Sequence, residues 1–478
     1  MSSFGMPNIL FIQPDQQRYD CIGYSRKYPV QTPHIDAIAR EGAWFERAYT
    51  PFPLCCPARQ ALLCGQRPHK LGAHWNYDYT YCGYLRPEHF SWPRLLQENG
   101  YATGYAGKWH VSPDHDPTAF GFDEYYSLAD YYRWRGEHFP DCPWPGPVIT
   151  GEDQYQGMLK GWQGAVDPIG TPHSKTHWMA DRVIDMIRRA HAQGKPWHMR
   201  LDFEEPHLPC CPTKEFMDMY PPETIPQWDN FPDPLTDKPY IQKQQLLNWG
   251  VENYTWADWA PAVARYYALV TQIDDAIGKV LRVLDELGIA ENTMVIYMPD
   301  HGDLGGAHGM MDKQYCMYED IVHVPLCVRY PARIRPGTVV RDYVYSCLDI
   351  QPTILEYLGL PAPDSFEGES LVSLIDGHTP GHWRQEIVSA YNGMQFGLYT
   401  QRMLLADGWK YVWNTTDVDE LYDLSQDPAE LTNLIHRPDQ QERIRLYRRK
   451  LYDELIAQGD FLAGTPWMGY QLLNSKKL

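Results

Sequence analysis

The stretch NILFIQPDQQ, residues 8–17, decides the fold of this chain. Its first half, Asn8 to Ile12, is an almost continuous apolar run, which is typical of a strand buried on both faces of a sheet. Asp15 and Gln16 follow directly. A second run of this kind, Thr293 to Met298, is followed by Pro299, Asp300 and His301. Because open α/β sheets bind ligands beyond the carboxyl ends of their strands, these two polar ends predict a shared site.

Helical segments alternate with such strands. Residues 32–42 (TPHIDAIAREG) predict a helix with Thr32 as N-cap, and residues 177–194 and 262–287 carry apolar side chains at helical spacing. The segment Trp197 to Phe203 alternates apolar and polar residues, which favours a strand with one wet face, central or at an edge. The alternation predicts an α/β protein with a mostly parallel central sheet flanked by helices.

Two aromatic-rich regions, residues 125–163 and 219–260, have no clear period and predict long loops. Their rings could stack on a sugar or aryl group, or pack between the subunits of a homo-oligomer. After about residue 380 the chain becomes hairpin-like and then helical over about 440–458. We therefore expect a catalytic domain over residues 1–380 and a smaller C-terminal α+β domain with an antiparallel sheet over 381–478.

Composition excludes several classes of partner. The net charge of −19 opposes broad capture of nucleic acid or of an anionic membrane surface. No signal peptide precedes the first apolar run, and no run has transmembrane length. The 11 cysteines are an odd number, which favours reduced thiols over a disulfide framework. A cytoplasmic location is expected.

Two adjacent thiols, Cys55 and Cys56, stand directly before Pro57 in the sequence CCPAR. They could be small buried hydrophobes, or one could be a nucleophile or the precursor of one. Residues 57–64 have helical character, so Cys55 would lie where unpaired N–H groups and roughly half a positive charge meet an anion.

Six blocks of the chain carry a family resemblance. In order they are PNILFIQPDQQRYD (7–20), CCPAR (55–59), GKWH (107–110), EEPHLP (204–209), PDHGDLGGAHGMMDK (299–313) and ELYDLSQDP (420–428). Their order and spacing resemble those of the formylglycine-dependent, Cys-type (type I) sulfatases of the alkaline phosphatase superfamily. The resemblance covers nearly the whole chain. It implies an alkaline-phosphatase-like domain and a sulfate monoester hydrolase that releases inorganic sulfate and an alcohol or phenol.

The resemblance also identifies the nucleophile. In that family the first residue of a Cys-x-Pro-x-Arg motif is oxidised to formylglycine, and only Cys55 has Pro57 and Arg59 at this spacing. Cys56 is then the variable position. Ala58 and Cys64 replace the serine and threonine that are most common there. A formylglycine-generating or sulfatase-maturating enzyme is an implied partner.

A divalent metal is implied as well. Asp15, Gln16, Asp300 and His301 resemble the family's ligands, together with an oxygen of the group made from Cys55. Ca²⁺ is the first expectation, because hard cations prefer oxygen ligands. The imidazole of His301 would suit Mn²⁺ or Zn²⁺ better, so these remain alternatives.

Other positions match residues that handle the sulfate group. By resemblance Lys108 binds the sulfate oxygens, His110 assists the formylglycine hydrate, and Arg59 steadies it; in an extended GKWH segment Lys108 and His110 would share a face. His207 and Lys313 would contact the sulfate and the leaving oxygen. The further candidates for substrate contact are Asn76, His308 and Arg18.

The implied mechanism has two steps: an oxygen of the hydrated aldehyde attacks sulfur, and deprotonation of the second hydroxyl then expels sulfate. The substrate is expected to be a small-molecule or carbohydrate sulfate ester. Two alternatives stay open. One is a phosphonate monoester or phosphodiester hydrolase of the same superfamily, and the other is a catalytically silent sulfatase-like binding protein in which Cys55 is never oxidised.

Overall fold

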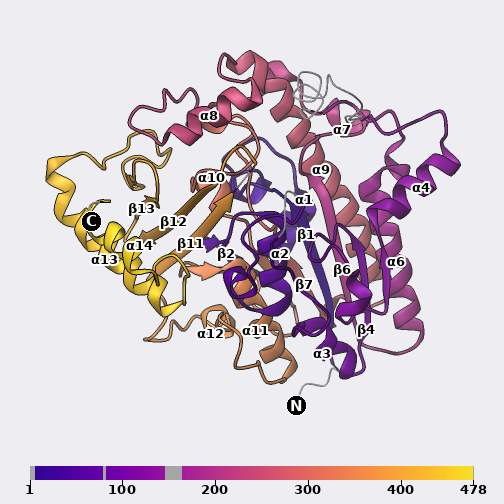
Figure 1. Cartoon of the computed structure of the whole chain (residues 1–478). Helices are drawn as coiled ribbons and strands as arrows, with labels where there is room; N and C mark the ends of the chain where they lie inside the picture. Colours follow the sequence, from indigo (N-terminus) through magenta and orange to yellow (C-terminus); the bar gives the residue numbers. More distant parts are fainter. Residues whose placement is uncertain (1–5, 79–81, 146–163, 394, 477–478) are drawn as a thin grey trace.

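An eight-stranded sheet forms the centre of the large part of the chain (Figure 1). The computed structural model describes residues 6–78, 82–145, 164–393 and 395–476. The strand order is β5-β4-β6-β1-β7-β8-β2-β9, and only β8 runs antiparallel to its neighbours. The strands are β1 (Asn8–Asp15), β2 (Ala43–Phe45), β4 (Ala102–Gly107), β5 (Glu124–Tyr126), β6 (Trp197–Pro206), β7 (Thr293–Tyr297), β8 (Cys327–Arg329) and β9 (Thr338–Val340).

Strand β1 lies in the middle of this sheet, which explains its apolar run. Parallel pairing places Ile9 opposite His198 of β6 on one side and opposite Met294 of β7 on the other. Successive side chains of a strand point to opposite faces. Ile9 and Phe11 accordingly enter one core cluster, and Leu10 and Ile12 enter another. Both faces are covered, so the predicted mostly parallel α/β sheet is confirmed.

Each face is covered by its own set of helices. One face packs on α1 (Pro33–Arg40), α6 (Lys175–Ala192) and α9 (Trp256–Glu286). The other face packs on α2 (Cys55–Cys64), α3 (Trp92–Glu98), α11 (Ser346–Leu358) and α12 (Val372–Ile375). None of the helices in the described part of the chain combines the length and the apolarity that a membrane span requires.

Strand β6 differs from its predicted environment. It lies between β4 and β1 and is buried on both faces, although its polar residues had indicated one wet face. The guanidinium of Arg200 donates to the carboxylate of Asp202 at 2.9 Å, and His198 packs against Trp92 with 4.6 Å between ring centroids. The alternation therefore reflects polar groups that are buried, paired with each other in Arg200 and Asp202 and packed on an aromatic ring in His198, not exposure to solvent.

Two predicted loops contain helices. Helix α4 (Leu128–His138) begins with a capping box made by Ser127 and Asp130, and α8 (Tyr240–Trp249) ends at Gly250 in the left-handed conformation. A capping box at Thr255 starts α9 six residues before the predicted helix. Residues that cap helix ends are therefore sufficient to form these helices, although the apolar residues of both regions show no helical period. Residues 146–163 of the first predicted loop lie outside the described residues.

The C-terminal region forms a separate antiparallel sheet, as predicted. Its strands are β11 (Glu386–Gly393), β12 (Tyr399–Ala406), β13 (Trp409–Asn414) and β14 (Glu420–Asp423). One face joins the core of the large sheet, and the other is covered by α13 (Gln441–Ala457) and α14 (Pro466–Leu473), in yellow in Figure 1. The domain boundary at residue 380 stays a prediction. The remaining short elements are β3 (Ala48–Tyr49), β10 (Val344–Tyr345), α7 (Lys214–Met217) and α10 (Glu319–Val322).

Candidate active site

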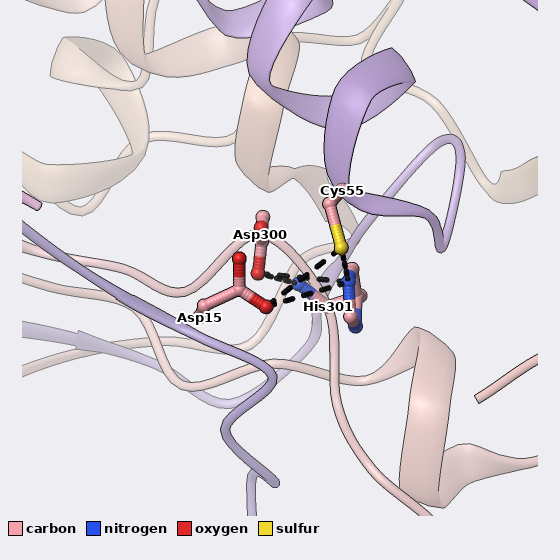
Figure 2. A group of neighbouring side chains, drawn as sticks. All are labelled: Asp15, Cys55, Asp300 and His301. Carbon is pink, nitrogen blue, oxygen red and sulfur yellow. Dashed lines mark hydrogen bonds and ion pairs between the residues drawn. The ribbon is translucent and has the colours of Figure 1, made fainter. Parts of the chain in front are cut away.

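The carboxyl ends of β1 and β7 meet the first turn of α2, as Figure 2 shows. Four donor atoms, from Asp15, Cys55, Asp300 and His301, lie within 4.8 Å of one another, and all four residues are buried. The Cys55 Sγ atom is 3.2 Å from His301 Nε2 and 3.8 Å from Asp15 Oδ1. Two predicted polar strand ends and the predicted nucleophile thus form one group, which we call the Cys55 cluster.

Arg59 links the carboxylates of this cluster. It lies one helical turn after Cys55 on α2, and its guanidinium donates to Asp300 at 2.9 Å and to Asp15 at 3.0 Å. A third contact, 3.2 Å long, reaches Asp202 within β6. Sequence reasoning missed Asp202, because it stood in a segment assigned to a half-wet strand. Because its guanidinium binds three buried carboxylates, Arg59 holds these side chains together beside Cys55.

Electrostatics favour an anion at position 55. Burial alone would raise the pKa of the Cys55 thiol, but Lys313, Lys108 and His301 outweigh it and hold that pKa well below its usual range. The thiol also stands at the N-terminus of α2, where the helix dipole is positive. The thiol occupies the place where the oxygens of a formylglycine would lie.

Lys108 reaches the cluster because Gly107 precedes it. A Cβ at Gly107 would lie 1.8 Å from the carbonyl oxygen of Asp202, and its φ of +120° disfavours other residues. The close approach lets the Lys108 N–H donate to that carbonyl at 2.8 Å. The Lys108 ammonium then pairs with Asp15 at 2.8 Å.

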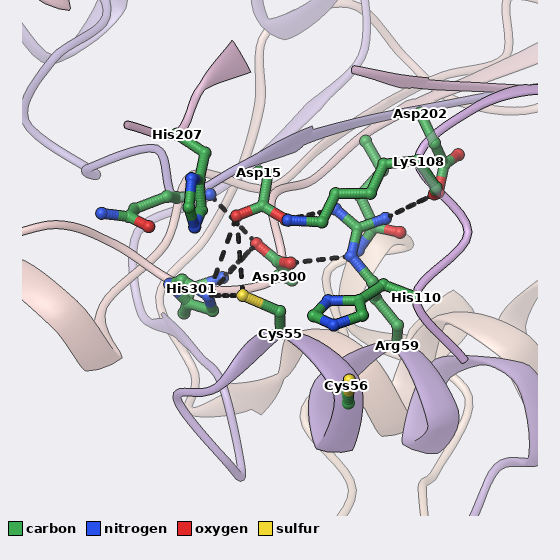
Figure 3. A network of polar contacts seen from close by, with 12 residues as sticks. Asp15, Cys55, Cys56, Arg59, Lys108, His110, Asp202, His207, Asp300 and His301 are labelled. Atoms are coloured by element: carbon green, nitrogen blue, oxygen red, sulfur yellow. Dashed lines mark hydrogen bonds and ion pairs between the residues drawn. The ribbon is translucent and has the colours of Figure 1, made fainter. Parts of the chain in front are cut away.

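His110 stands beside Cys55 and above Cys56 in Figure 3. Its φ of 51° breaks the extended course predicted for GKWH, so Lys108 and His110 reach the cavity without regular strand geometry. His110 Nε2 lies 2.5 Å from Asp78 Oδ2, a contact that sequence reasoning did not foresee. The only local indication in the sequence was that Asp78 lies two residues after Asn76, a predicted substrate contact.

Lys313 and His207 form a second pair at the cavity. Lys313 Nζ lies 2.7 Å from His207 Nε2 and donates to the Gln16 amide oxygen at 2.7 Å. The Gln16 main-chain N–H donates to Asp300 at 3.1 Å. Gln16 therefore borders the Cys55 cluster, but its amide oxygen already accepts from Lys313, and its predicted role as a metal ligand stays a prediction.

These groups open into a cavity of about 630 Å³. Its polar lining includes Cys55, Asn76, Asp78, Lys108, His110, Glu204, His207 and Lys313. Its aromatic lining is Tyr77, Trp109, Tyr125 and Trp249. Asn76 also accepts the Cys56 main-chain N–H at 3.0 Å, which satisfies one of the free donors at the start of α2.

Two predicted substrate contacts lie elsewhere. Neither Arg18 nor His308 lines this cavity. Arg18 pairs with Asp20 at 2.8 Å, and both ring nitrogens of the buried His308 face other polar side chains. Their placement does not fit contact with a substrate at Cys55, because neighbours of their own already hold them.

The Cys55 cluster has the composition of a divalent metal site. His301 Nδ1 lies 2.9 Å from the Gly302 carbonyl oxygen, which only accepts, so Nδ1 carries a hydrogen. In the neutral ring, the form that binds a metal, the lone pair then lies on Nε2 and faces the carboxylates. Burial would lower the pKa of His301, but Asp300 and Cys55 raise it to about 9. This field stabilises a positive charge between the two carboxylates, and Asp15, Asp300 and His301 fit a divalent cation.

Comparison with known proteins decides the family. Residues 7–360 match the family described as Sulfatase, and residues 306–457 match the family described as N-sulphoglucosamine sulphohydrolase, C-terminal. The chain belongs to the sulfatase family. An arylsulfatase of Clostridium perfringens is 31% identical to it over 94% of each chain. The protein is accordingly a sulfuric ester hydrolase of the alkaline phosphatase superfamily.

Solved structures show the same fold. A structure of a protein with its substrate D-glucosamine-2-N,6-O-disulfate superimposes on this sulfatase with a TM-score of 0.75, at 20% identity, covering 96% of this chain and 99% of the other. The phosphonate monoester hydrolase of Agrobacterium radiobacter gives a TM-score of 0.79 at 22% identity, covering 95% and 96%. At these identities the likeness concerns the fold alone.

Proposed function

We propose that this sulfatase hydrolyses sulfate monoesters through a formylglycine made from Cys55 and a divalent cation, with Ca²⁺ as the first candidate. The observation that carries the proposal is the Cys55 cluster: the thiol at the start of α2 lies 3.2 Å from His301 Nε2 and 3.8 Å from Asp15 Oδ1. A nucleophile is thereby held beside the carboxylates and imidazole that fit a cation.

A formylglycine at position 55 would supply a hydrated aldehyde, with one hydroxyl to bond the sulfur and a second whose deprotonation releases sulfate. Lys108 and Lys313 both face this position and would neutralise charge on the sulfuryl oxygens. His110 stands beside it as the base. These four positions agree with the roles that the family resemblance implies.

A proton for the leaving oxygen can come from Lys313 and His207. His207 Nδ1 lies 2.6 Å from the Leu208 carbonyl oxygen, so Nδ1 carries the hydrogen and Nε2 accepts from the Lys313 ammonium. The pair therefore holds an acidic proton at the cavity wall.

Asp15, Asp300 and His301 would hold the cation, which supplies Lewis-acid stabilisation of the sulfate group. Oxygen atoms from two aspartates favour Ca²⁺, and the imidazole leaves Mn²⁺ or Zn²⁺ as alternatives.

The substrate class follows from the cavity. Its aromatic walls and its carboxylate, amide and hydroxyl groups suit a sulfated sugar, which agrees with the disulfated glucosamine of the structural neighbour. A phenyl sulfate is also compatible with the aromatic lining. A maturation enzyme that oxidises Cys55, a cytoplasmic location and a homo-oligomeric state stay predictions.

A substrate panel tests this proposal. Protein is made with a formylglycine-generating system, and conversion of Cys55 is quantified by mass spectrometry of its peptide. Release of sulfate is then measured from 4-nitrophenyl sulfate and glucosamine 6-sulfate, and release of 4-nitrophenol from a 4-nitrophenyl phosphonate monoester, which has the same leaving group as the aryl sulfate. We expect the aryl sulfate to have a higher kcat/KM than the matching phosphonate. The reverse order would favour the phosphonate hydrolase, and Cys55 that stays unconverted in the presence of the maturation system, without any turnover, would favour a binding protein.

A further inference from the structure

Three consecutive residues, Asn76, Tyr77 and Asp78, all contact groups at the start of α2 or the neighbouring His110. Asn76 Oδ1 accepts the Cys56 N–H at 3.0 Å. The Tyr77 ring meets the His110 ring edge-on, with 5.2 Å between centroids and 77° between planes. Asp78 Oδ2 lies 2.5 Å from His110 Nε2. The segment thus joins the helix that carries the nucleophile to the residue expected to act as base.

The Asp78 contact determines which nitrogen of His110 carries a hydrogen. The hydrogen bond with His110 lowers the pKa of Asp78, so this carboxylate is ionised at neutral pH and can only accept. Nε2 must then be the donor. Burial would lower the pKa of His110, but Cys56, Asp78 and Cys55 outweigh it and raise that pKa well above its usual range. When the ring gives up a proton so that it can act as a base, Asp78 keeps the hydrogen on Nε2, and the lone pair lies on the buried Nδ1. Figure 3 places this ring beside Cys55.

The contacts with Tyr77 and Asp78 also hold His110 in an unfavourable backbone conformation. A φ of 51° is uncommon for a residue other than glycine, and strained residues persist where their surroundings hold them. Tyr77 packs against the ring and Asp78 binds its outer nitrogen. Without these contacts the ring could rotate about its side-chain torsions into the cavity.

We propose that Asp78 is a positioning residue of the sulfatase reaction, whose carboxylate binds Nε2–H of His110 and thereby holds the Nδ1 lone pair toward position 55. This inference rests on the proposed function, because it assigns His110 as the base. Asp78 does not touch the reacting atoms. It acts through His110, as the aspartate does in other aspartate–histidine pairs.

The competing explanation is an ordinary surface ion pair. Asp78 is 55% exposed, and exposed pairs contribute little to stability. The His110 side chain, however, is only 14% exposed and lines the catalytic cavity. The two explanations differ in what a substitution changes: a surface pair leaves kcat unchanged, whereas a positioning residue lowers kcat and leaves KM and stability nearly unchanged.

The first test compares Asp78→Asn with wild-type protein, with rates divided by the formylglycine content of each preparation. We expect kcat for 4-nitrophenyl sulfate to fall about 10- to 100-fold, the usual effect of losing a partner that orients a site residue. KM should stay within about threefold and the Tm nearly constant. Asp78→Glu keeps a carboxylate and should recover part of the lost rate.

Asp114→Asn is the matched control. Asp114 is also exposed and accepts a hydrogen bond of 2.5 Å, from Tyr84, but it does not line the cavity. It should keep the wild-type kcat. A kcat for Asp78→Asn within twofold of wild type, an equal loss in Asp114→Asn, or no recovery in Asp78→Glu would overturn the proposal.

A double-mutant cycle separates action through His110 from an independent effect. If Asp78 acts only through His110, the double variant Asp78→Asn/His110→Ala should be no slower than His110→Ala alone. Losses that multiply would overturn the proposal. Wild-type protein that is converted but inactive would instead contradict the proposed function itself, so the two failures are distinguishable.

Discussion

The pKa values of two buried histidines seven residues apart, His301 and His308, are shifted in opposite directions in this sulfatase. His301 lies in the Cys55 cluster, and Asp300 and Cys55 raise its pKa against the effect of burial. For His308, burial and the Lys238 ammonium lower the pKa. Both stand among carboxylates. The difference lies in the nearest charged neighbours: the Lys238 ammonium acts on His308, whereas the Asp300 carboxylate and the Cys55 thiol act on His301.

The surroundings of His308, which we call the His308 cluster, are self-contained. Its Nδ1 lies 2.6 Å from Asp233 and its Nε2 lies 3.1 Å from Asn230, and Lys238 pairs with Asp233. The ring also stacks on Tyr318, 3.7 Å away. In the Cys55 cluster His301 Nε2 instead faces a thiol and two carboxylates beside an open cavity. His301 and His308 are thus equally buried, but only His301 touches a group, Cys55, that lines the cavity.

Removing the nucleophile should have the largest effect. In Cys55→Ala neither lysine nor a metal can replace the covalent partner, so kcat should fall at least about 10⁴-fold, as when other covalent nucleophiles are removed. Sulfate release measures the loss, and the Tm should stay close to that of wild type. Turnover by this variant at a rate near wild type would mean that the Cys55 cluster is no more catalytic than the His308 cluster.

The second largest effect is expected on metal binding, which should distinguish the two clusters. Asp15→Ala or Asp300→Ala should lose bound metal and about 10³-fold in rate, which corresponds to several kcal/mol of charge stabilisation. Asp233→Ala, the matched change in the His308 cluster, should keep the metal that the Cys55 cluster binds. Elemental analysis of the purified variants provides the measurement. Full metal occupancy in both Asp15→Ala and Asp300→Ala would remove these residues from the site.

A substitution in the His308 cluster should lower the stability of the protein and leave its activity nearly unchanged. His308→Ala removes the imidazole partner of Asp233 and Asn230, which keep their contacts with Lys238 and Asp320. The loss of these buried hydrogen bonds costs about 1–3 kcal/mol, and the Tm should fall by a few degrees, as such a loss predicts for a large domain. The kcat of the folded fraction should stay within about twofold. A large loss of kcat with unchanged Tm would mean that His308 serves the reaction after all.

The smallest effect is expected next to the nucleophile. Cys56 is fully buried, and its main-chain N–H, which any residue supplies, makes the contact with Asn76. Cys56→Ser should therefore keep activity within about threefold, the range of a near-isosteric buried change. The peptide should carry the aldehyde at position 55 and an unmodified residue at 56. An activity loss as large as that of Cys55→Ala would contradict the assignment of Cys55.

Much of the site was predictable because it lies at strand ends. Asp15, Asp300 and His301 follow apolar runs, and Cys55 stands at a helix start, so local pattern and helix electrostatics were sufficient. Arg18 and His308 stay untested as substrate contacts; they occur in the matching sequence blocks, but the structure places them outside the cavity and against other polar partners. Asp78 and Asp202 were missed because an aspartate on a loop or on a strand carries no local sign of its partner.

The sequence by itself determined the alternation of strands and helices and the central place of residues 8–12, and the Cys55-x-Pro57-x-Arg59 spacing, read through the family resemblance, supplied the candidate nucleophile. These depend on periodicity and spacing over short distances along the chain. Only the tertiary structure decided that β6 is buried, that Arg59 joins three carboxylates, and that Asp78 binds His110. Such contacts join residues tens to hundreds of positions apart, and a buried charge is stable only where folding brings its partner to it.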